Sequence, residues 1–278
     1  MNINEQIIKN FSEKFNFIDE SVVPNKYVFI GGTALMLLSM DADFEEIRGT
    51  KDYDIVLLVK DSEGNKELFK KMWEYIEEGE YDVFQTKEGT PQYYRFTNPS
   101  NKREYPEQLE FFSNAPDFIN GREERFTPLH VDDDIQSLSS IIMNDIYYDF
   151  ILTQCRIVQN VNSVTELGLM ALKARAYNDL SERKKEDPRI ASKNIDKHKK
   201  DIIRVLEFIA PDNICDLNEY PEIQDDIKIF IKNLEEIYSE DESIRVGDIN
   251  TKIDDIRTGL KQHFSIKGYM EHRNEIVR

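Results

Sequence analysis

Residues 27–35 read YVFIGGTAL, and this run decides the fold expected for the N-terminal half. Its first four residues are β-formers, so they predict a strand that Gly31 and Gly32 stop before a helix-favouring stretch at 33–40. Glycines at such a junction let a backbone approach a phosphate closely, and the helix N-terminus points N–H groups at it. The junction is thus a candidate phosphate site, although a Gly-Gly turn is usually structural. It matches neither GxGxxG nor GxxxxGK[ST], so it does not favour a Rossmann or P-loop protein.

The next informative run is TKDYDIVL at residues 50–57, which opens a strand predicted at 54–59. Side chains alternate along a strand, so Asp52 and Asp54 are expected on one face. Two carboxylates so close repel each other unless a cation lies between them. Mg²⁺ is typically bound by one or two carboxylates and completes its shell with water and substrate phosphate. The run therefore predicts a Mg²⁺ site, with an acidic strand edge in solvent as the alternative.

A third acid is Glu110, which stands between bulky apolar residues in QLEFF at 108–112. If this strand pairs beside the Asp52/Asp54 strand, three carboxylates converge. That arrangement suits two metal ions that activate an attacking oxygen and neutralise a leaving pyrophosphate. Asp82 is a rival third ligand, and a solvent-facing Glu110 is the other interpretation.

The remaining patterns predict an α+β protein. In the N-terminal half we expect helices at 4–17 and 66–78 and strands at 81–85, 92–97, 108–112 and 126–131. Beyond residue 137 we expect mainly helices, at 163–185, 192–209, 223–238 and 251–263, with Ser192 as the N-cap of the second. These patterns predict a mixed-sheet domain with flanking helices at 1–135 and a mostly helical domain at 136–278.

Charge is unevenly distributed along the chain. The 278 residues include 36 Lys and Arg against 54 Asp and Glu, a net charge of −18, which argues against non-specific coating of nucleic acid. Residues 173–204 hold 11 basic and 6 acidic residues, or +5, so the rest of the chain carries −18 − 5 = −23. This basic segment predicts a local anion site, and a solvated helix face is the alternative.

Composition also predicts where the protein works. The longest mostly apolar stretch, 27–40, is too short to span a membrane and contains two glycines. Residues 1–6 lack the basic and apolar regions of a secretory signal. Cys155 and Cys215 are the two cysteines, and they form no CxxC or zinc pattern. We therefore expect a cytoplasmic protein without a membrane partner.

The motifs together form an ordered set that resembles the nucleotidyltransferase superfamily of DNA polymerase β. More narrowly, the chain resembles the AbiEii/AbiGii toxin family. That family's Gly-Gly-Thr-Ala-Leu and Arg-x-Thr-x-Asp-x-Asp runs are matched here by residues 31–35 and 48–54. Its helical Lys block and later Lys/Asp block are matched by residues 172–176 and 192–202. The resemblance covers residues 27–206, and its specificity comes from the order of the motifs.

The resemblance implies a nucleotidyltransferase fold and a role for each matching residue. The nucleoside triphosphate (NTP) would be held by Gly31, Gly32, Thr33, Thr50, Lys51 and Lys173. Two Mg²⁺ ions would be bound by Asp52, Asp54 and Glu110. The catalytic residues would be Asp52, Asp54, Lys173, which contacts phosphates, and Asp201, which orients the acceptor or a basic neighbour.

The implied reaction moves a nucleoside monophosphate from the NTP to an acceptor hydroxyl, on an RNA such as a tRNA 3′ end or on a protein. A cognate antitoxin would be the partner. The chain departs from the family in its 19 residues between Gly32 and Asp52, through an insertion near 41–46. It also has Glu110 where many relatives have Asp. Two alternatives stay open: a transferase with a small-molecule acceptor, of the antibiotic-modifying type, and a non-catalytic NTP-binding module.

Overall fold

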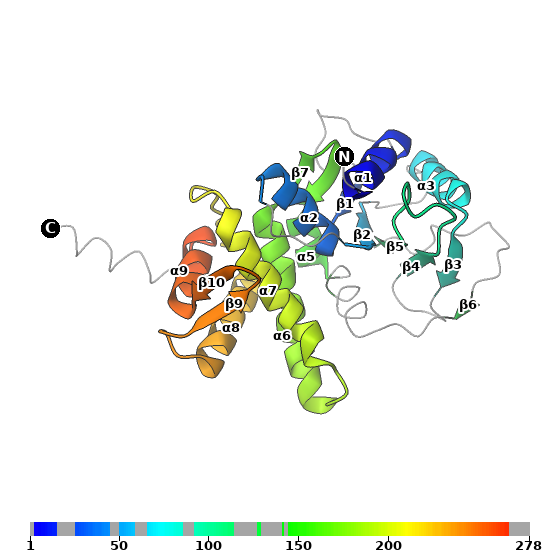
Figure 1. The fold of residues 1–278 in the computed structure, drawn as a ribbon. Coiled ribbons are helices and arrows are strands. Elements are labelled where there is room, and N and C mark those ends of the chain that lie inside the picture. Colours follow the sequence, from blue (N-terminus) through cyan, green and yellow to red (C-terminus); the bar gives the residue numbers. More distant parts are fainter. Residues whose placement is uncertain are drawn as a thin grey trace. The chain divides into compact units, whose positions relative to one another are not determined.

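The computed structural model describes residues 3–15, 26–44, 50–58, 66–85, 92–113, 127–128, 141 and 144–266. The chain divides into two compact units, Met1–Thr165 and Glu166–Arg278. The first holds helices α1 (Ile3–Lys14), α2 (Gly31–Asp41), α3 (Lys66–Glu78) and α5 (Asp145–Thr153). Its strands are β1 (Tyr27–Phe29), β2 (Asp52–Leu57), β3 (Asp82–Gln85), β4 (Gln92–Thr97), β5 (Gln108–Ser113), β6 (Thr127–Pro128), β7 (Cys155–Val158) and β8 (Val161–Val164) (Figure 1).

The strands of the first unit form one mixed sheet, which has eight strands in the part of the chain that is described. Their order is β6-β3-β4-β5-β2-β1-β8-β7. The central strand β2 pairs with β1 antiparallel and with β5 parallel, so that Asp54 lies beside Glu110. Helices and a mixed sheet in one unit confirm the predicted α+β class.

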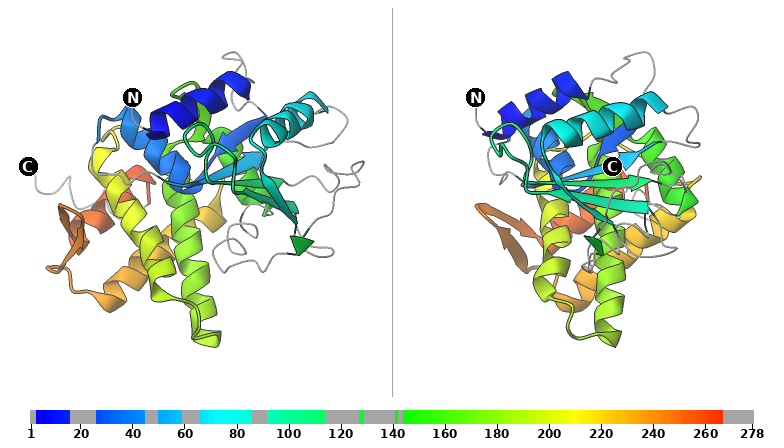
Figure 2. Two further views of the ribbon diagram at one scale, coloured as in Figure 1. Left: turned by 45° about the vertical axis from the view of Figure 1, so that its right-hand side comes forward. Right: turned by 90° about the vertical axis from the view of Figure 1, so that its right-hand side faces the viewer.

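Helices α1 and α3 lie on the same side of this sheet (Figure 2). An aromatic cluster joins them to it: the ring of Phe11 in α1 lies 4.9 Å from that of Phe29 and 5.2 Å from that of Tyr75 in α3. Tyr53 of β2 belongs to this cluster, with its ring 5.6 Å from that of Phe29. Because side chains alternate along a strand, Asp52 and Asp54 belong to the opposite face of β2.

The buried tyrosines of this unit predict a loss of stability at alkaline pH. Burial raises the pKa of Tyr148 from 10.0 to about 12, and it also raises the pKa of Tyr27 and Tyr53. The folded state therefore holds these phenol protons more tightly than the unfolded state. Their contribution to stability is complete below pH 10.0 and is lost as the pH rises toward about 12. We expect tyrosinate absorbance to rise together with the loss of helical circular dichroism, and ionisation well before unfolding would contradict this.

The first unit extends further along the chain than the sequence predicted. Residues 155–164 form the β7–β8 hairpin, and β8 joins the sheet by pairing with β1 at Ser163 and Phe29. The two units divide at Thr165/Glu166. The predicted boundary at 135/136 lies outside the described residues. For the same reason the helix expected from residue 163 begins at Glu166.

The second unit is mostly helical, as predicted, with α6 (Glu166–Glu186), α7 (Ser192–Phe208), α8 (Pro221–Ile237) and α9 (Ile253–His263). It also contains a hairpin of β9 (Ser243–Val246) and β10 (Ile249–Lys252), which the sequence analysis missed. The prediction of Ser192 as an N-cap was wrong. Ala191 is the N-cap residue, and the Ser192 hydroxyl accepts a hydrogen bond from Lys184. Among all the helices described, none is long and apolar enough to cross a membrane.

Candidate functional site

The Gly-Gly junction lies directly against Asp54. Helix α2 begins at Gly31, whose φ is +63°, and the Ile30 N–H donates to the Asp54 carbonyl oxygen at 3.0 Å. A Cβ atom on Gly31 would lie 2.9 Å from Cγ of Asp54 and closer still to its Oδ2. The carboxylate therefore packs on the glycine backbone at the N-terminal end of α2, where the helix dipole favours negative charge.

Asp52 is held by two hydroxyl groups. Thr33 Oγ1 and Thr50 Oγ1 each donate to the Asp52 carbonyl oxygen at 3.0 Å. Thr33 is fully buried, whereas Asp52 is exposed. Gly32 lies close to one of these hydroxyl groups, because a Cβ atom added to Gly32 would be 3.2 Å from Thr50 Oγ1. The resemblance assigns Thr33 to nucleotide binding. In the structure the Thr33 hydroxyl holds the backbone of Asp52 in place.

Glu110 lies next to Asp54 on the adjacent strand, because β5 pairs with β2. It is 3% exposed, and its Oε1 accepts from Arg95 Nε at 3.0 Å and from Gln108 Nε2 at 2.6 Å. Arg95 Nη2 also lies 2.9 Å from Oε1. Arg95 stands directly opposite Glu110 in the register of β4 and β5. The charge of the third acid is therefore balanced by a guanidinium group.

Asp82 does not join this group. Strand β3 is separated from β2 by β4 and β5, and the Asp82 carboxylate accepts a hydrogen bond from Asn98 at 3.0 Å. Within the described ranges, no group of three or more His, Cys, Asp or Glu side chains is arranged to hold a metal ion. Asp52 and Asp54 fit an ion that takes two carboxylates and completes its shell with water and phosphate. Asp52, Asp54 and Glu110 are therefore not arranged as a metal site of three carboxylates.

Lys51, which the resemblance assigns to the nucleotide, contacts an acid in the structure. Its Nζ lies 2.7 Å from Oε1 of Glu107, and both side chains are in contact with solvent. The hydrogen bond from Lys51 holds the pKa of Glu107 below its usual value. Arg48 and Gly49, at the start of the same motif, lie outside the described residues, as do residues 45–46 of the expected insertion.

Lys173 and Asp201 both lie in the second unit, on α6 and α7, and they form an ion pair. Lys173 Nζ is 2.7 Å from Oδ2 of Asp201, with side-chain exposures of 8% and 14%. Arg204 Nη1 lies 3.1 Å from Oδ1 of the same carboxylate. Asp201 therefore has two basic partners, and the ammonium group that the resemblance gives to a phosphate is paired inside the protein.

Part of the basic segment is likewise used internally. Lys199 is 6% exposed, with its Nζ 2.9 Å from Asp196 Oδ1 and 3.0 Å from the Tyr238 hydroxyl. Its ammonium also lies 5.2 Å from the centre of the Tyr238 ring, in the range of a cation–π contact. Lys199 and Asp196 already cancel within the +5 charge of residues 173–204, so their pairing leaves that net charge unchanged and removes one ammonium group from those that a ligand could contact.

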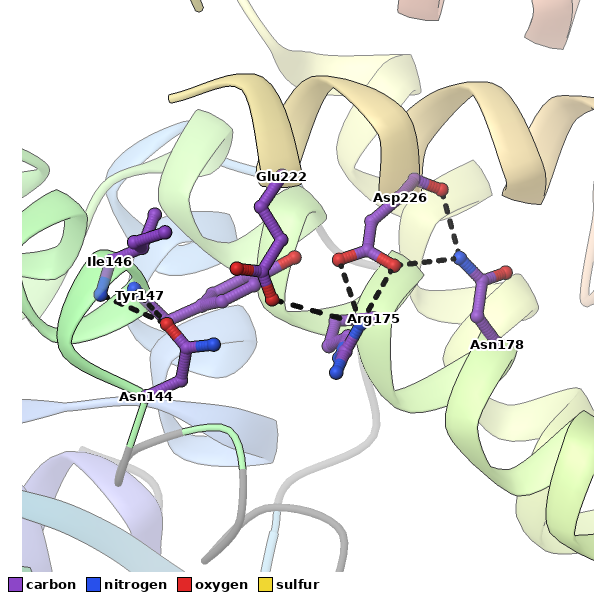
Figure 3. Close-up of polar contacts among 7 residues, drawn as sticks. All are labelled: Asn144, Ile146, Tyr147, Arg175, Asn178, Glu222 and Asp226. Carbon is purple, nitrogen blue, oxygen red and sulfur yellow. Dashed lines mark hydrogen bonds and ion pairs between the residues drawn. The ribbon is translucent and has the colours of Figure 1, made fainter. Parts of the chain in front are cut away.

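Arg175, from the predicted Lys block, also has a partner in its own unit (Figure 3). Its Nη1 lies 3.2 and 3.3 Å from the two carboxylate oxygens of Asp226, which is 3% exposed. Asn178 Nδ2 donates to the Asp226 carbonyl at 2.9 Å. Figure 3 also shows Asn144, which caps α5 by accepting from two backbone N–H groups. These contacts are structural: those of Asp226 join α6 to α8, and those of Asn144 cap the N-terminus of α5.

Sequence reasoning missed Arg95 and Asp226. Arg95 stands in the middle of a predicted strand, between Tyr94 and Phe96. A charged residue in such a position needs a partner on the same face, which was a signal for a buried ion pair. The identity of that partner depends on strand register, which no local pattern reveals.

The chain was also compared with known proteins. No protein-family model matches it, and no curated protein matches it either. The likeness to the AbiEii/AbiGii family thus stays a prediction that rests on the motifs and their order.

Proposed function

We propose that this protein is a Mg²⁺-dependent nucleotidyltransferase with the fold of the DNA polymerase β superfamily. One observation carries the proposal: Asp52 and Asp54 stand at alternate positions of β2 and so share one face of the strand. Asp54 also packs on Gly31, the glycine that begins α2. This places an acidic pair beside a helix N-terminus, where cation ligands and anion-binding N–H groups meet. Such a combination suits the triphosphate of a nucleotide bound together with its cation.

Each side chain at the site has a part in this activity. Asp52 and Asp54 would hold Mg²⁺, which when bound neutralises charge on the phosphates and on the leaving pyrophosphate. The N-cap residue of α2 is Ile30, whose side chain makes no capping hydrogen bond. The N–H groups of the first turn would therefore donate hydrogen bonds to the phosphates. Thr33 and Thr50 keep Asp52 in register by their hydrogen bonds to its carbonyl oxygen.

The acceptor and the setting are proposed from the family resemblance. An RNA 3′ end or a protein side chain would supply the attacking hydroxyl, in the cytoplasm, and a cognate antitoxin would restrain the activity. The net charge of −18 favours recognition of a specific end over binding along a nucleic acid.

The proposal is tested by incubating the protein with each labelled NTP, Mg²⁺ and total tRNA. We expect label to enter the RNA. Asp54→Asn should lower the rate of label transfer by at least roughly a hundredfold. Loss of a residue that only hydrogen-bonds to a metal ligand costs up to about a hundredfold, and Asp54 is proposed as a ligand itself. Asp82→Asn is the matched control, because it removes an exposed carboxylate on a strand away from β2 and should keep the wild-type rate.

Absence of transfer to RNA, to protein or to small hydroxyl compounds by the wild type would overturn the proposal. So would an Asp54→Asn variant as active as Asp82→Asn. Thermal stabilisation by Mg²⁺ and NTP without pyrophosphate release would instead identify a binding module.

A further inference from the structure

Two threonine hydroxyls meet at one carbonyl oxygen in the candidate site, and they differ in what else they can reach. Thr33 Oγ1 and Thr50 Oγ1 both donate to the Asp52 carbonyl oxygen at 3.0 Å. We propose that Thr33 is a positioning residue that keeps this hydrogen bond, whereas Thr50 turns its hydroxyl to a phosphate oxygen when a nucleotide binds. This inference rests on the proposed function, because it concerns the triphosphate and a metal ligand of the same site.

The count of donors separates the Thr33 hydroxyl from the phosphates. A threonine hydroxyl has one proton to donate, and a carbonyl oxygen can only accept it, so the proton of Thr33 is used on Asp52. The ionised oxygens of a phosphate also accept hydrogen bonds, and this hydroxyl cannot serve both acceptors at once. Thr33 is moreover 0% exposed, so a ligand does not reach its hydroxyl while the site keeps this structure.

The Thr50 hydroxyl is placed differently. Thr50 is partly exposed, and its Oγ1 lies beside the first turn of α2, 3.2 Å from the position of a Cβ atom added to Gly32. Gly31 and Gly32 are partly exposed too, and the N–H groups of a first turn are where a phosphate binds. Rotation of the Thr50 O–H bond would redirect its proton to such a phosphate, and the oxygen need not move.

Exposure also makes the two hydrogen bonds to Asp52 unequal. When Thr50 turns to a phosphate, water can donate to the carbonyl in its place, because this hydrogen bond is exposed. Water cannot replace Thr33 in the same way, because its side chain is enclosed by protein. Thr33 therefore holds the backbone of the proposed metal ligand before and after the nucleotide binds.

The test measures two probes on the full chain. Affinity for Mn²⁺ alone is measured from the electron paramagnetic resonance signal of the free ion, and affinity for tripolyphosphate at saturating Mg²⁺ is measured by calorimetry. Thr33→Val should weaken Mn²⁺ binding by about tenfold, the lower end of the cost of losing a partner of a metal ligand. Because saturating Mg²⁺ fills the metal site, its affinity for tripolyphosphate should stay within about threefold of wild type, well below that cost.

Thr50→Val should show the opposite pattern. Its affinity for tripolyphosphate should fall by about tenfold or more, the cost of a hydrogen bond to a charged group. Its affinity for Mn²⁺ should stay within about threefold of wild type, since water replaces an exposed donor at little cost. Thr33→Ser and Thr50→Ser are the matched controls: each keeps the hydroxyl and should restore the affinity that the corresponding valine variant loses.

The inference would be overturned if Thr33→Val weakened tripolyphosphate binding as much as Thr50→Val, or left Mn²⁺ binding unchanged. Unchanged tripolyphosphate binding in Thr50→Val would overturn it as well. A wild type that binds neither probe would overturn the proposed function itself, so the two failures differ. Circular dichroism checks the folding of each variant. If Thr33→Val does not fold, the comparison of Thr50→Val with Thr50→Ser decides the question, because Thr50 lies at the exposed end of the strand.

Discussion

Replacing Gly31 with alanine is expected to lower the free energy of unfolding by about 2–5 kcal/mol, by combining a strained backbone with an overpacked contact. Gly31 has φ of +63°, a left-handed conformation that a Cβ atom disfavours. The new Cβ would lie 2.9 Å from Cγ of Asp54, so the carboxylate must also move. Urea denaturation measures the loss of stability. Mn²⁺ binding measures the displacement of Asp54, and we expect it to be lost.

Gly32→Ala is the matched control for stability. Gly32 has no positive φ, and its added Cβ would meet Thr50 Oγ1 at 3.2 Å, a contact that a small shift relieves. Because alanine is favoured over glycine in a helix by up to about 1 kcal/mol, the change in stability should stay within that range. Equal destabilisation by the two substitutions would show that helix packing, and not the contact with Asp54, makes Gly31 necessary.

The sequence predicted the local elements of the first unit well between residues 27 and 113, because hydrophobic periodicity is a local signal, whereas helix α5 at Asp145–Thr153 was not predicted. Helix α3 and strand β4 have the predicted bounds, and β2 begins two residues earlier than expected. The common face of Asp52 and Asp54 also followed from alternation alone. The predicted strand at 126–131 is described only as β6, Thr127–Pro128, and the rest of it lies outside the described residues.

What could not be predicted depends on contacts between distant segments. Arg95 reaches Glu110 through the register of β4 with β5, which is set by the packing of the whole sheet. The return of β8 to β1 brings residues from beyond the predicted boundary into the first unit. The hairpin of β9 and β10 was missed because its strands are only four residues long and carry charged residues among apolar ones. Each of these features needs a partner strand before its sequence pattern has a meaning.

The pairing of Lys173 with Asp201 leads to the second large effect. Asp201→Leu should lower the free energy of unfolding by about 3–5 kcal/mol, because it leaves the buried Lys173 ammonium without its carboxylate. Lys173→Met should cost less, since Asp201 keeps Arg204 at 3.1 Å. In the double variant Lys173→Met/Asp201→Leu no charge is left unpaired between these two positions. Replacing a buried ion pair by apolar residues of similar size is often neutral, so we expect stability within about 2 kcal/mol of wild type.

The comparison of the three variants by urea denaturation separates two roles of Lys173. If the pair is structural, the effects of the single substitutions are not additive, and the double variant recovers most of the loss caused by Asp201→Leu. If Lys173 instead has phosphate contact as its main task, Lys173→Met should leave the unfolding midpoint almost unchanged and raise KM for the NTP. Since Lys173 Nζ is 2.7 Å from Asp201 and its side chain is 8% exposed, we expect the non-additive result. A fully additive cycle would show that the two charges do not depend on each other, and would return Lys173 to the role that the resemblance implies.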